Sequence, residues 1–444
     1  MDDNWRNESI AFSARTDVGM RRSNNQDHYC VEPASTLRLW NARGHLFIVA
    51  DGMGAHAAGE RASELATKVV SQSYLKRTNE NPPEALKNAI LEAHSVIKKQ
   101  GESDLSFENM GTTCDALVLF PDRGYIGHVG DSRVYRVRDR VVEQMTFDHS
   151  LVWEVKYNPS AHSALRQVAH IPKNVITRSL GPTENLVVDV EGPFKTKPGD
   201  AFLLCSDGLS GQVSDTEIGQ VLEIFQPEDA TESLVNLANL RGGPDNVTVV
   251  VARVKSVSKS EEIDQEIKKS TKVYEKRPPL SAVALGAAIT ACVLWALAGV
   301  LLLIREDAQW FMAVKIGAAV AAAISTTVFF VLGRASIFRG AFSDQNEQKL
   351  GKGPYIRASA APTREFHDNI DAVCDELCLV LKNDEESAKI GFKPDWKGID
   401  EARKQAKSAA ASEDYTTSIR ANFSVVNYVM REYKKNSPQR KNGR

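Results

Sequence analysis

Short runs of apolar residues recur through the first 254 residues, and most of them end at turn-forming residues. An apolar run bounded by Gly, Asp or Asn is typical of a buried β-strand. An edge strand and a turn are expected within residues 9–31. Further strands are predicted at 46–50, 114–120, 125–129, 133–137, 186–190, 201–205 and 247–254.

Apolar residues at helical spacing predict amphipathic helices in the same region. These helices are expected at 60–76, 85–97, 215–224 and 228–240. Strand runs and helix runs are segregated rather than strictly alternating, and this order favours the α+β class. The stretch 148–174 has mixed polarity and weak periodicity, so no regular element is assigned to it.

Two much longer apolar runs follow a charged linker at 255–279. Residues 280–304 contain no charged side chain, and a helix rising about 1.5 Å per residue over that length spans a ~30 Å hydrocarbon core. Residues 311–333 form a second run, in which Lys315, near the start, is the single charged side chain. A buried soluble helix is the alternative, but it is rarely so long and so uniformly apolar. The pattern predicts a transmembrane hairpin over 280–333.

Basic residues lie on both flanks of this hairpin, in 255–279 before it and at Arg334 and Arg339 after it. Positive flanks tend to stay in the cytoplasm. We therefore expect a multi-pass protein of the cell inner (cytoplasmic) membrane, with both flanks in the cytoplasm. The loop between the two runs, 305–310, is too short to fold independently.

The last part of the chain is expected to be a linker, 334–364, and a helical tail, 365–444. Apolar residues at helical spacing occur between Phe366 and Leu381 and again between Ile419 and Tyr433. A small helical bundle and a hairpin that binds a protein partner both fit this pattern. The charges of the tail nearly cancel, so nucleic-acid binding is not indicated.

Composition adds few constraints. The formal net charge is -2, which indicates neither a nucleic acid nor an acidic partner. The polar N-terminus lacks the apolar segment of a signal peptide. The six cysteines are scattered without a Cys-x-x-Cys pair, and this suits a reducing cytoplasm.

Carboxylates gather at the ends of the predicted strands. Asp51-Gly52 and Asp207-Gly208 each follow an apolar run, Asp131 follows another, and Asp245 precedes the strand at 247–254. Asp27 closes a polar stretch. Each Asp-Gly pair alone is more often only a turn. Several such carboxylates without His or Cys companions are typical of a site for a hard cation such as Mg²⁺ or Mn²⁺.

These motifs together resemble the metal-dependent Ser/Thr protein phosphatases of the PPM family (type 2C). The resemblance covers about residues 9–254 and rests on five motifs in the family's order. They are Asp17-Val18-Gly19 through Asn25-Gln26-Asp27, Asp51-Gly52-Met53-Gly54, Gly130-Asp131-Ser132-Arg133, Ser206-Asp207-Gly208 and Asp245-Asn246-Val247-Thr248-Val249.

The resemblance implies a four-layer α-β-β-α sandwich over 1–254, with the metals at one end of the two sheets. It implies that Asp27, Asp51, Asp207 and Asp245, with the carbonyl of Gly52, bind two core Mg²⁺ or Mn²⁺ ions. Asp131 matches the ligand of a third, weaker ion in bacterial members, and Arg22 matches a phosphate-binding arginine. In the family, the region near 148–174 carries a mobile flap beside the active site.

Some positions depart from the family pattern. Gln26 replaces a common Glu, which removes a charge near the metals, and Ala55 replaces a usual Gly. Met53 stands where animal members have a proposed general acid, His. His56 is close to Met53 in the sequence and could serve as the general acid instead. A loop histidine with no catalytic role fits the sequence equally well.

The chain is thus expected to be a membrane-anchored phosphatase acting on phosphoserine and phosphothreonine proteins, with a two-metal-activated water. An inactive phosphatase fold that binds phosphoproteins as a membrane adaptor is the alternative, and the intact carboxylate set argues against it. A membrane receptor is a third reading, which the short loop at 305–310 disfavours.

Overall fold

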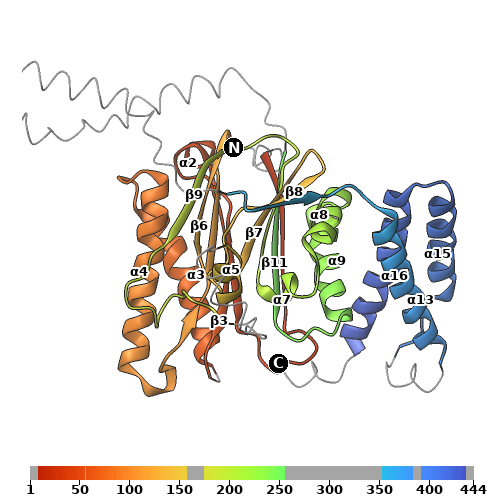
Figure 1. The fold of residues 1–444 in the computed structure, drawn as a ribbon, viewed down its shortest axis with the longest axis horizontal. Coiled ribbons are helices and arrows are strands. Elements are labelled where there is room, and N and C mark those ends of the chain that lie inside the picture. The colour runs from red at the N-terminus through yellow and green to blue at the C-terminus, as the bar shows by residue number, and fades with distance from the viewer. Residues whose placement is uncertain (1–8, 56, 158–174, 256–352, 384–391, 437–444) are drawn as a thin grey trace, which may run out of the picture. The chain divides into compact units, whose positions relative to one another are not determined.

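Two antiparallel β-sheets form the centre of the structure, which is a computed structural model (Figure 1). The structure describes residues 9–55, 57–157, 175–255, 353–383 and 392–436, all within one compact unit. One sheet has the order β1 (Ile10–Asp17), β11 (Val247–Val254), β10 (Ala201–Cys205), β7 (Arg133–Arg138), β8 (Val141–Gln144) and β12 (Ile356–Ser359). The other has the order β2 (Asp27–Glu32), β3 (His45–Met53), β5 (Cys114–Leu119), β6 (Arg123–Val129) and β9 (Asp189–Lys195), with β4 (Gly111–Thr112) beside β3.

The position of β3 explains why its sequence is apolar at successive positions. Phe47 and Val49 contribute to the core between the two sheets. Leu46, Ile48 and Ala50 contribute to a second core, which the helices on the outer face complete. Because successive side chains of a strand point to opposite faces, a strand buried on both faces needs an unbroken apolar run.

Helices cover the outer face of each sheet, which gives four layers (Figure 1). On one side these are α3 (Ala58–Lys76) and α4 (Pro82–Ser103), and on the other α8 (Asp215–Ile224) and α9 (Pro227–Leu240). The start of α8 is fixed by a capping box between Ser214 and Glu217. This arrangement confirms the predicted α+β sandwich.

Several short elements were not predicted because each is too short to show a period. They are α2 (Leu37–Arg43), η1 (Leu105–Phe107), β4, β8, α5 (Leu151–Tyr157) and α7 (Asp207–Ser210). The expected flap region, 148–174, begins with described residues that include α5, and its remainder, 158–174, lies outside the described residues.

The C-terminal helices are part of the same unit as the sandwich. They are α13 (Arg364–Lys382), α15 (Trp396–Ala411) and α16 (Tyr415–Asn436). Phe423 of α16 is fully buried between Phe225, at 5.5 Å between ring centroids, and Phe366 of α13, at 6.2 Å. The sandwich and the tail therefore share one hydrophobic core.

The tail also extends the sheet. Residues 356–359, which lie in the predicted linker 334–364, form β12 and pair antiparallel with β8. The helix α15 was not anticipated, because its sequence is rich in Ala and Lys with few large apolar residues. The sequence left two possibilities for the tail, a helical bundle and a partner-binding hairpin. The described residues form a small helical bundle packed on α9.

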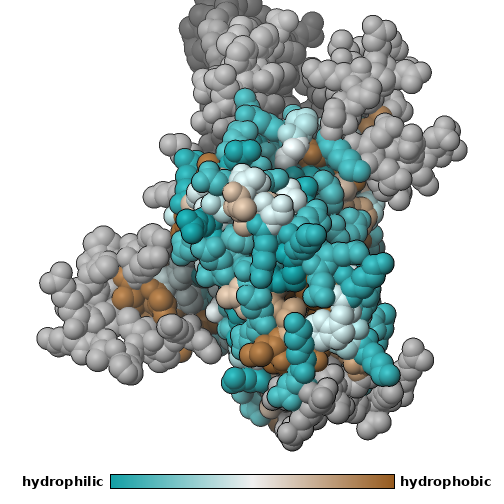
Figure 2. All heavy atoms as spheres, turned by 90° about the vertical axis from the view of Figure 1, so that its right-hand side faces the viewer, coloured by the Kyte–Doolittle hydropathy of each residue, from teal (hydrophilic) through white to brown (hydrophobic). Residues whose placement is uncertain are grey.

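The outer surface on the side of α13, α15 and α16 is mostly hydrophilic (Figure 2). Among large hydrophobic side chains, Leu379 of α13 is an exception, with 72% of its surface exposed. Most of the large apolar side chains of the tail are thus used inside the unit rather than displayed.

The predicted transmembrane hairpin, 280–333, and the rest of 256–352 lie outside the described residues. No helix within the described part of the chain is long and apolar enough to span a membrane.

The shared core gives a test of the tail's place in the fold. Phe423→Ala should lower the free energy of unfolding of the full chain by about 3–5 kcal/mol, because it leaves a cavity between the tail and the sandwich. Urea unfolding followed by tryptophan fluorescence measures this. The control is Leu379→Ala, at an exposed site on the same bundle, which should change stability by no more than about 0.5 kcal/mol. Equal effects of the two variants would contradict a shared core.

Candidate metal centre

The register of one strand pair brings two of the predicted ligands together. Asp27 begins β2 and lies directly opposite Asp51 of β3 in the antiparallel ladder. Cβ atoms of residues directly opposite in such a pair are about 4.5–5.5 Å apart. Asp27 is the first residue of β2, whereas Asp51 lies two residues before the end of β3, which continues through Gly52 to Met53.

The second sheet supplies further groups to the same place. Ser206, at the end of β10, donates a hydrogen bond from Oγ to Asp27 Oδ2 at 2.7 Å. The backbone N–H of Thr248 in β11 donates to Ser206 Oγ at 3.0 Å. Asp207 begins α7 directly after Ser206, and Asp245 lies just before β11. The facing ends of the two sheets therefore carry the carboxylates.

The carboxylates also affect one another electrostatically, which indicates that they lie close together. Burial, followed by the negative charges of Asp27 and Asp207, raises the pKa of Asp51 well above its usual range. Burial raises the pKa of Asp27 to about 7, with Asp207 and Asp245 adding to the effect. Burial and the charge of Asp245 also raise the pKa of Asp207.

Asp131 belongs to the same cluster. It lies between β6 and β7, and burial, followed by the charge of Asp207, raises its pKa to about 7. Gly130 before it has φ of +115°, a conformation that favours glycine, and a Cβ there would lie 2.5 Å from the side chain of Thr113. Thr113 Oγ1 accepts a hydrogen bond from the backbone N–H of Asp51 at 2.9 Å. The turn that carries Asp131 is therefore packed on a residue bonded to Asp51.

The donor atoms fit a hard divalent cation. Asp27 Oδ1 is buried and has no hydrogen-bond partner, which costs free energy unless a cation or a proton meets it. Among the described residues, no three side chains of His, Cys, Asp or Glu are already arranged to hold an ion. Mg²⁺ usually keeps several waters and binds through one or two carboxylates, so a ready-made triad is not required.

The backbone at Gly52 is held tightly at this place. Its N–H donates to Gln26 O at 3.0 Å, and a Cβ at Gly52 would lie 2.1 Å from Gly59 O. Any larger residue would force the strand away from α3. The absence of a side chain therefore lets the backbone at Gly52 sit beside the carboxylate cluster.

Arg22 lies at the rim of the cluster. Its Nη2 is 2.8 Å from Asp245 Oδ2, and the two side chains are 50% and 35% exposed. The structure thus brings together Arg22 and the five aspartates predicted from the sequence, while their individual roles as ligands and phosphate-binding group stay predictions.

Sequence reasoning gave no role to several residues that hold the cluster in place. Asn246 accepts a hydrogen bond from Gln26 N through Oδ1 and donates through Nδ2 to Val18 O and Asn24 O. Ser206 and Thr113 act as described above. The sequence signal for these supporting residues is a small polar side chain next to, or across the sheet from, one of the site aspartates.

The departures from the family pattern have mixed outcomes. Gln26 Nε2 donates to Gly54 O at 3.1 Å, so this amide supports the loop after Asp51. Met53 ends β3 and is partly buried. His56 lies outside the described residues, so its part stays open.

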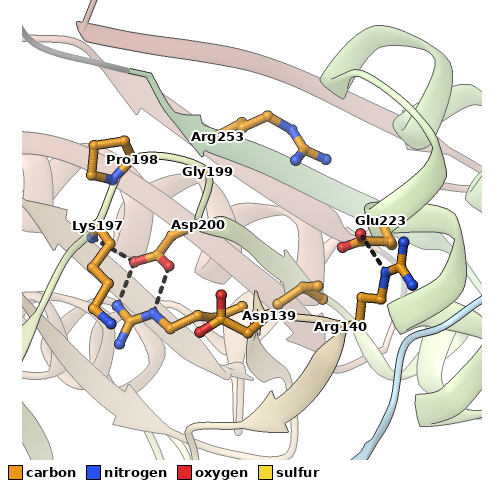
Figure 3. Close-up of a pocket in the computed structure, with 10 residues that line it drawn as sticks. Asp139, Arg140, Lys197, Pro198, Gly199, Asp200, Glu223 and Arg253 are labelled. Carbon is orange, nitrogen blue, oxygen red and sulfur yellow. Dashed lines mark hydrogen bonds and ion pairs between the residues drawn. The ribbon is translucent and has the colours of Figure 1, made fainter.

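A separate surface cavity of about 470 Å³ lies at the other end of the sheet, where β7 and β11 end (Figure 3). Its lining contains no predicted site residue. Arg138 pairs with Asp200 through two hydrogen bonds, and Arg140 lies 3.8 Å from Glu223. These paired charges distinguish the cavity from the carboxylate cluster.

A two-sheet sandwich that carries a cluster of buried carboxylates at one end is typical of a protein that binds divalent cations. Residues 21–238 match the family described as Protein phosphatase 2C. The protein phosphatase PhpP of Streptococcus pneumoniae is 35% identical over 248 residues, which cover 54% of this chain and 96% of PhpP. The Ser/Thr phosphatase stp of Listeria monocytogenes is 35% identical over 243 residues, 53% of this chain and 93% of stp. The chain belongs to the protein phosphatase 2C family.

The similarity to the Ser/Thr protein phosphatase PstP of Mycobacterium tuberculosis is 36% identity over 250 residues, but it covers only 45% of PstP and 55% of this chain. A crystal structure of PstP has a TM-score of 0.48 at 33% identity and covers 56% of this chain and 100% of that chain. A further PstP catalytic-domain structure, with a TM-score of 0.45, is described as a complex with 2 manganese ions.

The raised pKa values predict that Mn²⁺ binding depends on pH. Asp27 and Asp131 each have a pKa of about 7 in the metal-free protein, so both are largely protonated below pH 7. A cation needs the ionised carboxylate, so binding releases protons and weakens as the pH falls. Calorimetric titration should show at least about tenfold weaker binding at pH 6 than at pH 8, with proton release seen as a buffer-dependent heat. Equal affinities at both pH values would contradict the cluster's electrostatics.

Proposed function

We propose that this protein is a Ser/Thr phosphoprotein phosphatase that uses two divalent ions to activate a water. The observation that carries the proposal is the buried aspartate cluster with an unpartnered oxygen of Asp27, on a chain of the protein phosphatase 2C family. The Ser/Thr phosphatases among its relatives support phosphoserine and phosphothreonine proteins as substrates.

Four carboxylates, Asp27, Asp51, Asp207 and Asp245, would hold two core ions with the carbonyl of Gly52. Bound Mg²⁺ or Mn²⁺ supplies positive charge and a more acidic water in such a site. Burial, followed by the charges of neighbouring aspartates, raises the pKa of Asp51, and a bound cation would offset both effects. Asp131, close enough to Asp207 and Asp51 to feel their charges, would hold a third, weaker ion.

Arg22 would bind the phosphoryl group of the substrate. A guanidinium presents a planar fork of N–H donors that matches phosphate oxygens. Half of its side chain is exposed, and its partner is Asp245, one of the proposed ligands. A cation held by Asp245 would compete for the carboxylate that now pairs with Arg22, and the guanidinium would then be available to bind a phosphoryl group.

The full chain should hydrolyse a phosphothreonine peptide with Mn²⁺ or Mg²⁺ and lose this activity in chelator. Asp207→Asn should lower kcat by about a hundredfold or more, because it removes a ligand charge from the core site. The matched control is Asp122→Asn, at a site 72% exposed and remote from the cluster, which should retain full activity. Activity that persists in chelator would refute the two-metal mechanism, and inactivity of the metal-loaded wild type would favour the adaptor alternative.

Asp131→Ala separates the third ion from the core pair. We expect calorimetry to show that the core ions still bind while turnover falls, because Asp131 would serve only the weaker site. Loss of all tight Mn²⁺ binding in this variant would place Asp131 in the core site instead.

We also propose that residues 280–333 anchor the protein in the cell inner membrane as a hairpin. The chain leaves the sheet after β11, at 254, and returns to the same sheet at 356, in β12. Because both strands belong to one sheet, the intervening segment must cross a membrane an even number of times. Two apolar runs satisfy this condition, and the flanking basic residues favour the cytoplasm for the whole unit.

Single cysteines added to the full chain test this topology. A membrane-impermeant thiol reagent added to intact cells should label Gln309→Cys, in the loop between the runs, but neither Ser270→Cys nor Gln345→Cys. Recovery of the chain in the soluble fraction, or labelling of Gln345→Cys from outside, would contradict the hairpin. Lysed cells provide the control that each cysteine can react.

A protein partner that binds the tail would contact only the outer surface of its helices. The apolar side chains of α13 and α16 are largely buried in the shared core. A partner would therefore meet the mostly hydrophilic face seen in Figure 2.

A further inference from the structure

The last helix among the described residues, α16, reaches the turn that begins the motifs of the carboxylate cluster. Lys434, near the end of α16, places Nζ 3.0 Å from Asp17 Oδ2 at the end of β1. The same Nζ donates to Asn236 Oδ1 of α9 at 3.2 Å. Residue 434 lies far outside 21–238, the part of the chain that matches the family.

Asp17 organises the turn that follows β1. Its Oδ1 accepts hydrogen bonds from Gly19 N at 3.0 Å and from Asn239 Nδ2 at 3.3 Å. The side chain of Asp17 is only 6% exposed and that of Lys434 19%. A carboxylate taken out of water is costly unless a charge and hydrogen bonds compensate it, and Lys434 contributes the positive charge.

This turn packs directly on the loop that presents Asp245. Gly19 has φ of +81°, and a Cβ there would lie 2.2 Å from Asp245 O. Met20 N donates to Gly243 O at 2.9 Å, and Val18 O accepts from Asn246 Nδ2 at 2.9 Å. A shift of the turn would therefore move the loop that carries Asp245.

We propose that Lys434 is a positioning residue of the metal centre, supplied by the C-terminal tail. Its ion pair with Asp17 holds the turn after β1 in place. Because the 243–246 loop packs on that turn, the ion pair also fixes the position of the Asp245 carboxylate. The consequence for catalysis rests on the proposed phosphatase function, whereas the consequence for metal binding does not. The tail would thus act on the metal centre through the ion pair between Lys434 and Asp17.

A neighbouring ion pair offers a matched control. Arg431, on the same helix, pairs with Glu232 of α9 at 2.9 Å and so also joins the tail to the sandwich. Because its partner is Glu232 rather than Asp17, Arg431→Met should weaken the tail's attachment without disturbing the turn. Lys434→Arg retains the cation, and Lys434→Gln retains a donor but removes the charge.

The test measures Mn²⁺ affinity by calorimetry, and kcat and KM for a phosphothreonine peptide, in the full chain. Loss of a residue that orients a ligand typically costs 10–100-fold in metal affinity or activity, and we expect about tenfold for Lys434→Met and Lys434→Gln. The loss should appear mainly in Mn²⁺ affinity and kcat, with a smaller change in KM, because Lys434 supports a proposed metal ligand and is not itself proposed to bind the substrate. Lys434→Arg should recover most of both, and Arg431→Met should behave like wild type.

Wild-type Mn²⁺ affinity in Lys434→Gln, or an equal loss in Arg431→Met, would overturn the proposal. The first result would remove the link from the turn to the metal centre, and the second would reduce Lys434 to general attachment of the tail. If the wild type binds Mn²⁺ but hydrolyses nothing, the phosphatase function fails, while weaker Mn²⁺ binding by Lys434→Gln would still support the positioning role.

Discussion

Mutual repulsion among buried carboxylates is the constraint on which the rest of this structure depends. The two sheets face each other so that Asp27 and Asp51 of one meet Asp207 and Asp245 of the other. Folding takes these groups out of water, and this burial, followed by the charges of nearby carboxylates, raises the pKa values of Asp27, Asp51 and Asp207. A cluster of this kind is tolerated where protons or cations neutralise it, so the strain of the metal-free site and its affinity for metal have the same origin.

The surrounding structure resists this repulsion at several points. The strand register fixes Asp27 opposite Asp51, and Ser206 binds Asp27 from the other sheet. Glycine at position 52 lets α3 approach the backbone closely. On the remaining side, the turn at Asp17 supports the loop of Asp245, and the C-terminal helix holds that turn through Lys434. The tail is thus joined to the site by contacts as well as by a shared core.

Much of the sandwich and of the carboxylate set could be predicted because each has a local signal. The apolar run before Asp51 marks a strand buried on both faces, although that strand continues through Gly52 to Met53 and does not turn at the glycine. The contacts of the tail have no such signal. Asp17 and Lys434 are more than four hundred residues apart in the sequence, and β12 lies in a polar stretch that reads as a linker. Only the three-dimensional packing shows that these segments meet.

Anomalous diffraction from crystals of the full chain grown with Mn²⁺ tests the central claim most directly. The account predicts two strong manganese peaks among the carboxylates of Asp27, Asp51, Asp207 and Asp245, with Asp27 Oδ1, which lacks a hydrogen-bond partner, now facing an ion. Manganese bound elsewhere, with this cluster empty at concentrations that saturate calorimetric binding, would contradict it.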